Sequence, residues 1–151
     1  MITRELLGTA QVPDGEELRL FAHGRDFIIA LGRNELMSTR MRYSEEQLAE
    51  LTLARLERAD PRLLIGGYGM GFTLRATLAA RPQARVTVAE LVPEIVDWAR
   101  GPMAELTAGC LDDPRVTLRM GDVAAYIDDA ADGTTEPYDA ILLDVDNGPD
   151  G

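Results

Sequence analysis

Three closely spaced glycines have the pattern of a ligand-binding loop. Gly67, Gly69 and Gly71 form a G-x-G-x-G motif between a short apolar run and a stretch with helical spacing. Glycines at such a junction let the backbone turn sharply and bring a ligand against the N-terminus of the following helix. An NAD fingerprint would place a third glycine at position 72, where this chain has Phe72. The motif therefore favours S-adenosylmethionine or a related ligand, with a simple tight turn as the structural alternative.

Acidic residues follow the next two predicted strands and can contact a ligand that the loop holds. Glu90 comes 19 residues after Gly71, where a carboxylate can accept hydrogen bonds from both hydroxyls of a ribose. Asp122 ends the following strand and can accept from an adenine amino group, with Val123 against the ring. Asp122 can also serve as the N-cap of the next helix, and one carboxylate can do both. These positions predict an adenosine site at the carboxyl edge of a sheet.

Asp144 follows the fourth predicted strand, on the same side of the sheet as the glycine loop. A primary amine must lose a proton before it attacks a carbon next to a sulfonium. A carboxylate at the site can orient the ammonium group and accept that proton. We therefore predict Asp144 as the catalytic residue, with a plain loop start as the alternative.

Other chemistries lack the residues that they require. The sequence contains no G-x-S-x-G motif for a nucleophilic serine, and no Gly-Lys-Ser/Thr follows the glycines. Cys110 is the only cysteine and His23 the only histidine, so we expect neither a disulfide nor a metal site. Two larger loop residues, Tyr68 and Met70, leave two interpretations open, since they can contact the cofactor or pack against the sheet.

Alternating strand and helix patterns must position these residues. Residues 18–38 have the pattern of a short β-meander, and Ser44 with Gln47 predicts a capping box at the start of a helix that stops before Asp60. Beyond it, strands and helices alternate, which predicts a parallel sheet with right-handed crossovers. The expected strands are 63–65, 86–89, 116–118 and 140–143, and the helices between them begin near Phe72, Pro93 and Asp122.

The predicted fold class is α/β, a Rossmann-like parallel sheet with flanking helices preceded by a small N-terminal β-meander. We divide the chain into a meander over residues 1–43 and an adenosyl-cofactor-binding domain over 44–151. The run 140–143 is apolar at consecutive positions, as in a strand that is covered on both faces. Because sheets of this kind normally continue, we expect that C-terminal strands are missing or that another chain covers this edge.

Composition and charge narrow the function classes. The 151 residues carry a net charge of −11, with only 15 scattered basic residues, which argues against nucleic-acid binding and favours cationic ligands. Nowhere do about 18 apolar residues run together, so we expect no membrane span. The cysteine usage fits a reducing compartment, and we expect a cytoplasmic protein.

The small β-meander and four motifs that follow it together carry a family resemblance over roughly residues 26–149. The motifs are LLIGGYGMGFTLR (63–75), VAELVPEIV (88–96), DDPRVTLRMGD (112–122) and YDAILLDVDNGP (138–149). In order and spacing the chain resembles the spermidine synthase, or polyamine aminopropyltransferase, family. The resemblance implies a transferase that moves an aminopropyl group from decarboxylated S-adenosylmethionine to a small-molecule diamine, commonly as a homodimer. It also implies that Glu90 binds ribose, Asp122 binds adenine and Asp144 is the catalytic aspartate.

Two alternatives to an aminopropyltransferase stay open, and a departure from the family favours the first of them. Family members usually carry an Asp inside the glycine loop, where this chain offers Tyr68 and Met70. A neutral loop would tolerate the carboxylate of intact S-adenosylmethionine, so a methyltransferase is the first alternative. A non-catalytic module that binds an adenosyl ligand is the second.

Overall fold

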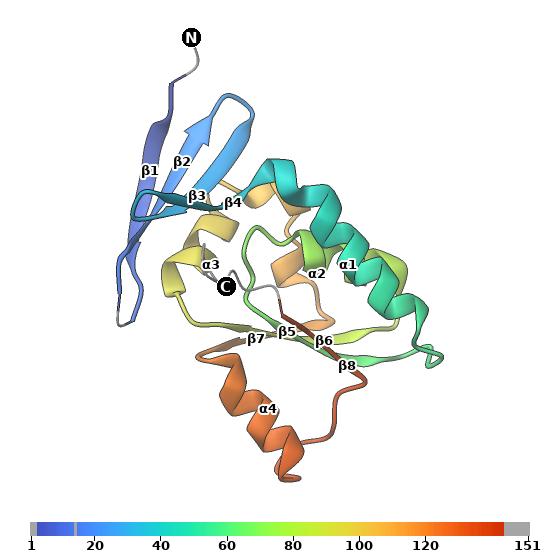
Figure 1. Ribbon diagram of the computed structural model, residues 1–151. Coiled ribbons are helices and arrows are strands. Elements are labelled where there is room, and N and C mark those ends of the chain that lie inside the picture. Colours follow the sequence, from blue (N-terminus) through green and yellow to red (C-terminus); the bar gives the residue numbers. More distant parts are fainter. Residues whose placement is uncertain (1–2, 14, 144–151) are drawn as a thin grey trace.

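The N-terminal part of the chain forms an antiparallel sheet (Figure 1). The computed structural model describes residues 3–13 and 15–143. Neighbouring strands pair in sequence order, as in a meander, and Ile28 and Ile29 of the third strand are fully buried. The strands are β1 (Glu5–Gln11), β2 (Glu17–His23), β3 (Asp26–Leu31) and β4 (Asn34–Ser38).

A second, parallel sheet follows, with the strand order β7-β6-β5-β8. Leu64 at its centre pairs with Thr87 on one side and with Ile141 on the other. This arrangement confirms the predicted α/β class and the Rossmann-like parallel sheet. The strands are β5 (Arg62–Gly66), β6 (Arg85–Glu90), β7 (Val116–Met120) and β8 (Ala140–Leu143); the helices are α1 (Arg42–Ala54), α2 (Phe72–Ala80), α3 (Pro93–Arg100) and α4 (Val123–Ala131), with short 3-10 helices η1 (Thr39–Met41), η2 (Ala104–Thr107) and η3 (Cys110–Asp112).

The two faces of the parallel sheet are covered unequally. Helices α1, α2 and α3 lie on one face, together with the antiparallel sheet, whereas α4 lies on the opposite face (Figure 1). The main core fills the first face because alternate strand residues such as Leu63, Ile65 and Val88 point into it. On the α4 side of the edge strand β8, Ile141 and Leu143 are 42% and 51% exposed.

Helix α3 packs between the antiparallel sheet and the parallel sheet. Trp98 of α3 is buried, and its indole ring lies directly against Gly8 of β1. A Cβ atom at Gly8 would lie 2.6 Å from Trp98 Nε1, so a larger residue there would displace the ring. The antiparallel sheet is therefore packed against the helical layer, although the division at residues 43 and 44 stays a prediction.

Two local predictions need correction. The prediction of a capping box at Ser44 and Gln47 was wrong. Helix α1 begins at Arg42, and the Gln47 side chain donates to the Tyr43 hydroxyl and not to the backbone. The chain enters α1 through η1, which Ser38 caps by accepting a hydrogen bond from the N–H of Arg40. The pattern over residues 18–38 also missed β1, which pairs with β2.

Within residues 3–13 and 15–143, no helix is long and apolar enough to cross a membrane. The same part of the chain has no group of three or more His, Cys, Asp or Glu side chains arranged to hold a metal ion.

Candidate functional site

The glycine loop connects β5 to α2 and has a backbone that only glycine adopts freely. Gly67, Gly69 and Gly71 have φ angles of +89°, +59° and +87°. The N–H of Gly67 donates to the carbonyl oxygen of Ala89 at 2.8 Å, which ties the loop to the end of β6. The carbonyl of Gly71 accepts from the N–H of Arg75 and so begins α2. The loop thus runs from the carboxyl end of a central strand into a helix N-terminus, as predicted.

Tyr68 and Met70 are part of the core, which decides between the two interpretations of these loop residues. They are 3% and 2% exposed. The Tyr68 hydroxyl lies 3.2 Å from Thr107 Oγ1 in η2 and 3.9 Å from Cys110 Sγ in η3. Burial raises the pKa of both the Tyr68 phenol and the Cys110 thiol. Sequence reasoning missed this cluster, because Tyr68 is 39 and 42 positions away from Thr107 and Cys110 and the three residues form no motif.

Glu90 holds the loop from the other side. Its side chain is buried, with the residue 4% exposed. Oε1 accepts from the N–H of Tyr68 at 2.8 Å, and Oε2 accepts from the N–H of Val92 at 3.0 Å. The two backbone donors stabilise a carboxylate that would otherwise be costly to bury. Glu90 is thus fixed at the end of β6, beside the loop.

Asp122 and Val123 lie where β7 leads into α4. Asp122 Oδ1 accepts from the N–H of Ala124 at 2.9 Å, so the predicted N-cap is confirmed. The N–H of Gly121 donates to the carbonyl oxygen of Glu90 at 2.8 Å and links the two strand ends. The Val123 side chain packs against Gly66, where a Cβ atom would lie 2.9 Å from Val123 Cγ2.

One cavity of about 120 Å³ lies at these strand ends. Four of the predicted site residues line it, and Ala89, Leu91 and Gly121 complete the lining. Sequence reasoning did not assign these three to the site, although each is next to a predicted carboxylate. Gly69 and Gly71 do not line the cavity, and Asp144 lies outside the described residues. The predicted lining residues are Gly67, Glu90, Asp122 and Val123.

Comparison with known proteins identifies the fold first. A spermidine synthase from Thermotoga maritima superposes with a TM-score of 0.74 at 21% sequence identity, over 94% of this chain and 47% of that chain. The fold is therefore of the Rossmann type found in methyltransferases and spermidine synthases. No family model matches the sequence.

Curated proteins of similar sequence include an aminopropyltransferase and a methyltransferase. A polyamine aminopropyltransferase from Korarchaeum cryptofilum is 31% identical over 149 residues, which is 96% of this chain and 42% of that protein. A putrescine N-methyltransferase from Nicotiana tabacum is 36% identical over 99 residues, which is 66% of this chain and 24% of that protein. Together with the shared fold, these similarities support a relationship to a spermidine synthase-like family. It spans less than half the length of these relatives.

Proposed function

We propose that this chain binds an adenosyl-sulfonium cofactor at the glycine loop and transfers an aminopropyl group from decarboxylated S-adenosylmethionine to a small amine. The observation that carries the proposal is the convergence of Gly67, Glu90, Asp122 and Val123 around one cavity. These residues come from the carboxyl ends of three adjacent parallel strands, where folds of this class bind ligands. The proposed reaction follows from the likeness to a polyamine aminopropyltransferase.

Glu90 is suited to bind the ribose. Each carboxylate oxygen has about two acceptor positions, and the N–H groups of Tyr68 and Val92 use one on each oxygen. The remaining positions can accept from the two ribose hydroxyls. Because the backbone bonds already fix the side chain, binding would require little further ordering of it.

Asp122 and Val123 are suited to bind the adenine. Oδ1 of Asp122 accepts the capping bond, whereas Oδ2 has no hydrogen bond within the described residues and can accept from the exocyclic amino group. Val123 offers an apolar contact for the ring. The cavity is smaller than the roughly 300 to 1,000 Å³ of typical small-molecule sites, so these residues would cover only the adenosine part of the cofactor.

Transfer to an amine requires alignment and removal of one proton. The sulfonium supplies a carbon activated for attack and a neutral leaving group. The protein needs to hold the amine in line with that carbon, and a carboxylate can accept the amine proton. Asp144 is our candidate for this role, on the ground that it directly follows β8 in the sequence. The net charge of −11 favours cationic acceptors such as polyamines.

A second candidate function is methyl transfer from intact S-adenosylmethionine. Tyr68 and Met70 are both buried, so within the loop only backbone groups are available to a ligand. Backbone N–H groups and the positive end of the α2 dipole suit a carboxylate better than an ammonium group. The likeness to a putrescine N-methyltransferase supports the same alternative.

Calorimetric titration with both cofactors distinguishes the two functions. Aminopropyl transfer requires that the decarboxylated cofactor binds at least as tightly as the intact one. Tighter binding of intact S-adenosylmethionine would exclude the first function and favour methyl transfer. Saturable binding without turnover of any amine would leave only a binding module.

A further inference from the structure

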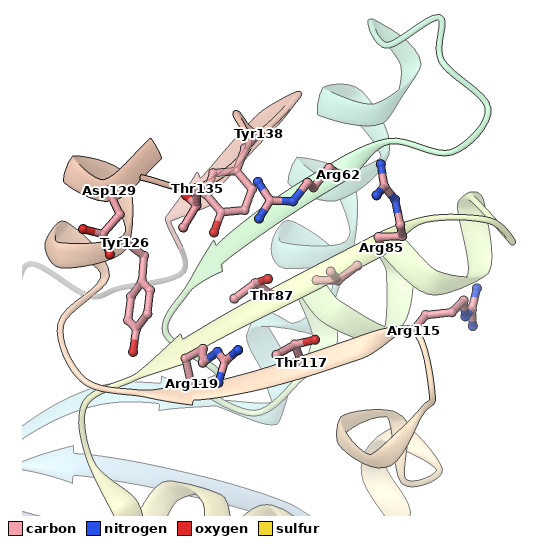
Figure 2. Close-up of a pocket in the computed structure, with 11 residues that line it drawn as sticks. Arg62, Arg85, Thr87, Arg115, Thr117, Arg119, Tyr126, Asp129, Thr135 and Tyr138 are labelled. Atoms are coloured by element: carbon pink, nitrogen blue, oxygen red, sulfur yellow. The ribbon is translucent and has the colours of Figure 1, made fainter. Parts of the chain in front are cut away.

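A second cavity lies between α4 and the face of the parallel sheet (Figure 2), with a volume of about 420 Å³. No residue predicted for the adenosine site lines it. Its arginines Arg62 and Arg85 are the first residues of β5 and β6, whereas Gly67 and Glu90 stand at the opposite ends of these strands. The two cavities are therefore separate, and both can be occupied at once.

The charge of this cavity is opposite to that of the chain. The whole sequence has 26 acidic and 15 basic residues, yet four arginines and one acidic residue, Asp129, line the cavity. Arg115 is paired with Asp113, and Arg62 and Arg85 lie 3.9 and 4.0 Å from the exposed carboxylate of Glu136. Such long, solvent-exposed contacts are weak. They leave these two guanidinium groups able to bind another anion.

The side chain of Arg119 in this cavity is available to bind an anion. Within the described part of the chain, its side chain makes no ion pair and no hydrogen bond. Figure 2 shows it beside Thr117 on β7, with Thr87 on the neighbouring strand. The hydroxyls of both threonines also make no hydrogen bond with the described residues. One guanidinium and two hydroxyl donors thus stand together on the sheet face.

Arg62 is held in place at the other side of the cavity. It donates to the carbonyl oxygens of Glu136 and Pro137, and its guanidinium lies 4.3 Å from the centre of the Tyr138 ring. An arginine held in this way is preorganised, so little side-chain entropy would be lost when an anion binds.

We propose that this cavity binds a small phosphate-bearing anion, at a site separate from the adenosyl cofactor. Planar guanidinium groups and hydroxyl donors match the oxygens of phosphate in geometry and charge. A single ion would occupy a small part of a 420 Å³ cavity. The ligand therefore carries either two linked phosphates or a phosphate with an organic group.

Calorimetric titration with inorganic pyrophosphate at low salt tests this proposal. We expect saturable 1:1 binding to the wild type and at least about tenfold weaker binding to Arg119→Gln. Thr117→Val, which removes only a hydroxyl donor, should weaken binding about threefold. Arg25→Gln is the matched control, because Arg25 is exposed in the turn between β2 and β3 and its loss changes the net charge equally. Its affinity should equal that of the wild type.

A second titration with cytidine diphosphate distinguishes the two sources of phosphate. If cytidine diphosphate binds more tightly than pyrophosphate, the natural ligand is a nucleotide. If it binds more weakly, the natural ligand is free pyrophosphate. Absence of saturable binding to either would overturn the proposal, and so would equal losses in Arg119→Gln and Arg25→Gln. Unchanged thermal unfolding of Arg119→Gln shows that the variant is folded. No adenosyl ligand is present, so the result is independent of the proposed transferase function.

Discussion

Replacement of Gly71 by alanine should destabilise the fold by about 2 to 5 kcal/mol, as the sum of two effects. The backbone at Gly71 has a φ of +87°, where a non-glycine residue costs about 1 to 2 kcal/mol. In addition, an alanine Cβ would overlap the Tyr68 hydroxyl and lie 2.6 Å from Tyr68 Cζ and 3.0 Å from Thr107 Cγ2. Overpacking of this kind costs about 1 to 3 kcal/mol. Tyr68 is buried and cannot move aside without disturbing the loop.

Gly109→Ala separates the two effects. Gly109 has a φ of +72°, but no atom lies within 4 Å of the position of its Cβ. The Gly109→Ala variant should therefore lose only about 1 to 2 kcal/mol of unfolding free energy, which is the cost of the backbone conformation. Urea unfolding followed by the fluorescence of Trp98, the single buried tryptophan, measures both variants. Equal losses in Gly71→Ala and Gly109→Ala would refute the inference that Tyr68 fills the space beneath the loop.

Three further predictions concern the carboxylates. The Glu90→Gln substitution replaces one acceptor oxygen by an amide donor that faces the N–H of Tyr68 or Val92. The free energy of unfolding in urea should therefore fall by about 1 to 3 kcal/mol, whereas the exposed control Glu57→Gln should leave it unchanged. Asp122→Ala should lose about 1 kcal/mol through the α4 cap, whereas an Asp122→Asn variant that loses as much would contradict a capping role. The hydrogen bond from Arg115 lowers the pKa of Asp113 from 3.8 to about 2, so its stabilisation is present above about pH 4 and is lost as the pH falls through 2. Urea midpoints of the wild type and Asp113→Asn should therefore differ at pH 7 and converge near pH 2; a constant difference would contradict this.

The parallel sheet could be predicted because its signals are local. Consecutive apolar residues marked β8 at its observed bounds, and the glycines marked the turn before α2. Because parallel strands align their carboxyl ends, Glu90 and Asp122 could also be placed together from sequence alone. The structure confirms this proximity, while their roles in binding stay predictions.

The remaining features depend on contacts between distant residues. Strand β1 is mostly exposed and contains Gly8, a residue type that does not favour strands. Glycine is needed at this position because the indole ring of Trp98 lies where a Cβ atom would be. The sequence left open whether Tyr68 contacts the cofactor or packs against the sheet, and in the structure it is buried in contact with Thr107 and Cys110. Neither contact leaves a periodic pattern in the sequence. Asp144, the predicted catalytic residue, lies outside the described residues.

The most direct test of the central claim is an NMR titration with 5′-methylthioadenosine, which carries the adenosine shared by both candidate cofactors. If the strand-end cavity binds adenosine, the amide signals of Gly67, Gly121 and Val123 should shift saturably, while those of β1 to β4 stay in place. In the Glu90→Gln variant, the same shifts should reach saturation only at a higher ligand concentration than in the wild type. Unchanged spectra, or shifts confined to other surfaces, would contradict the account.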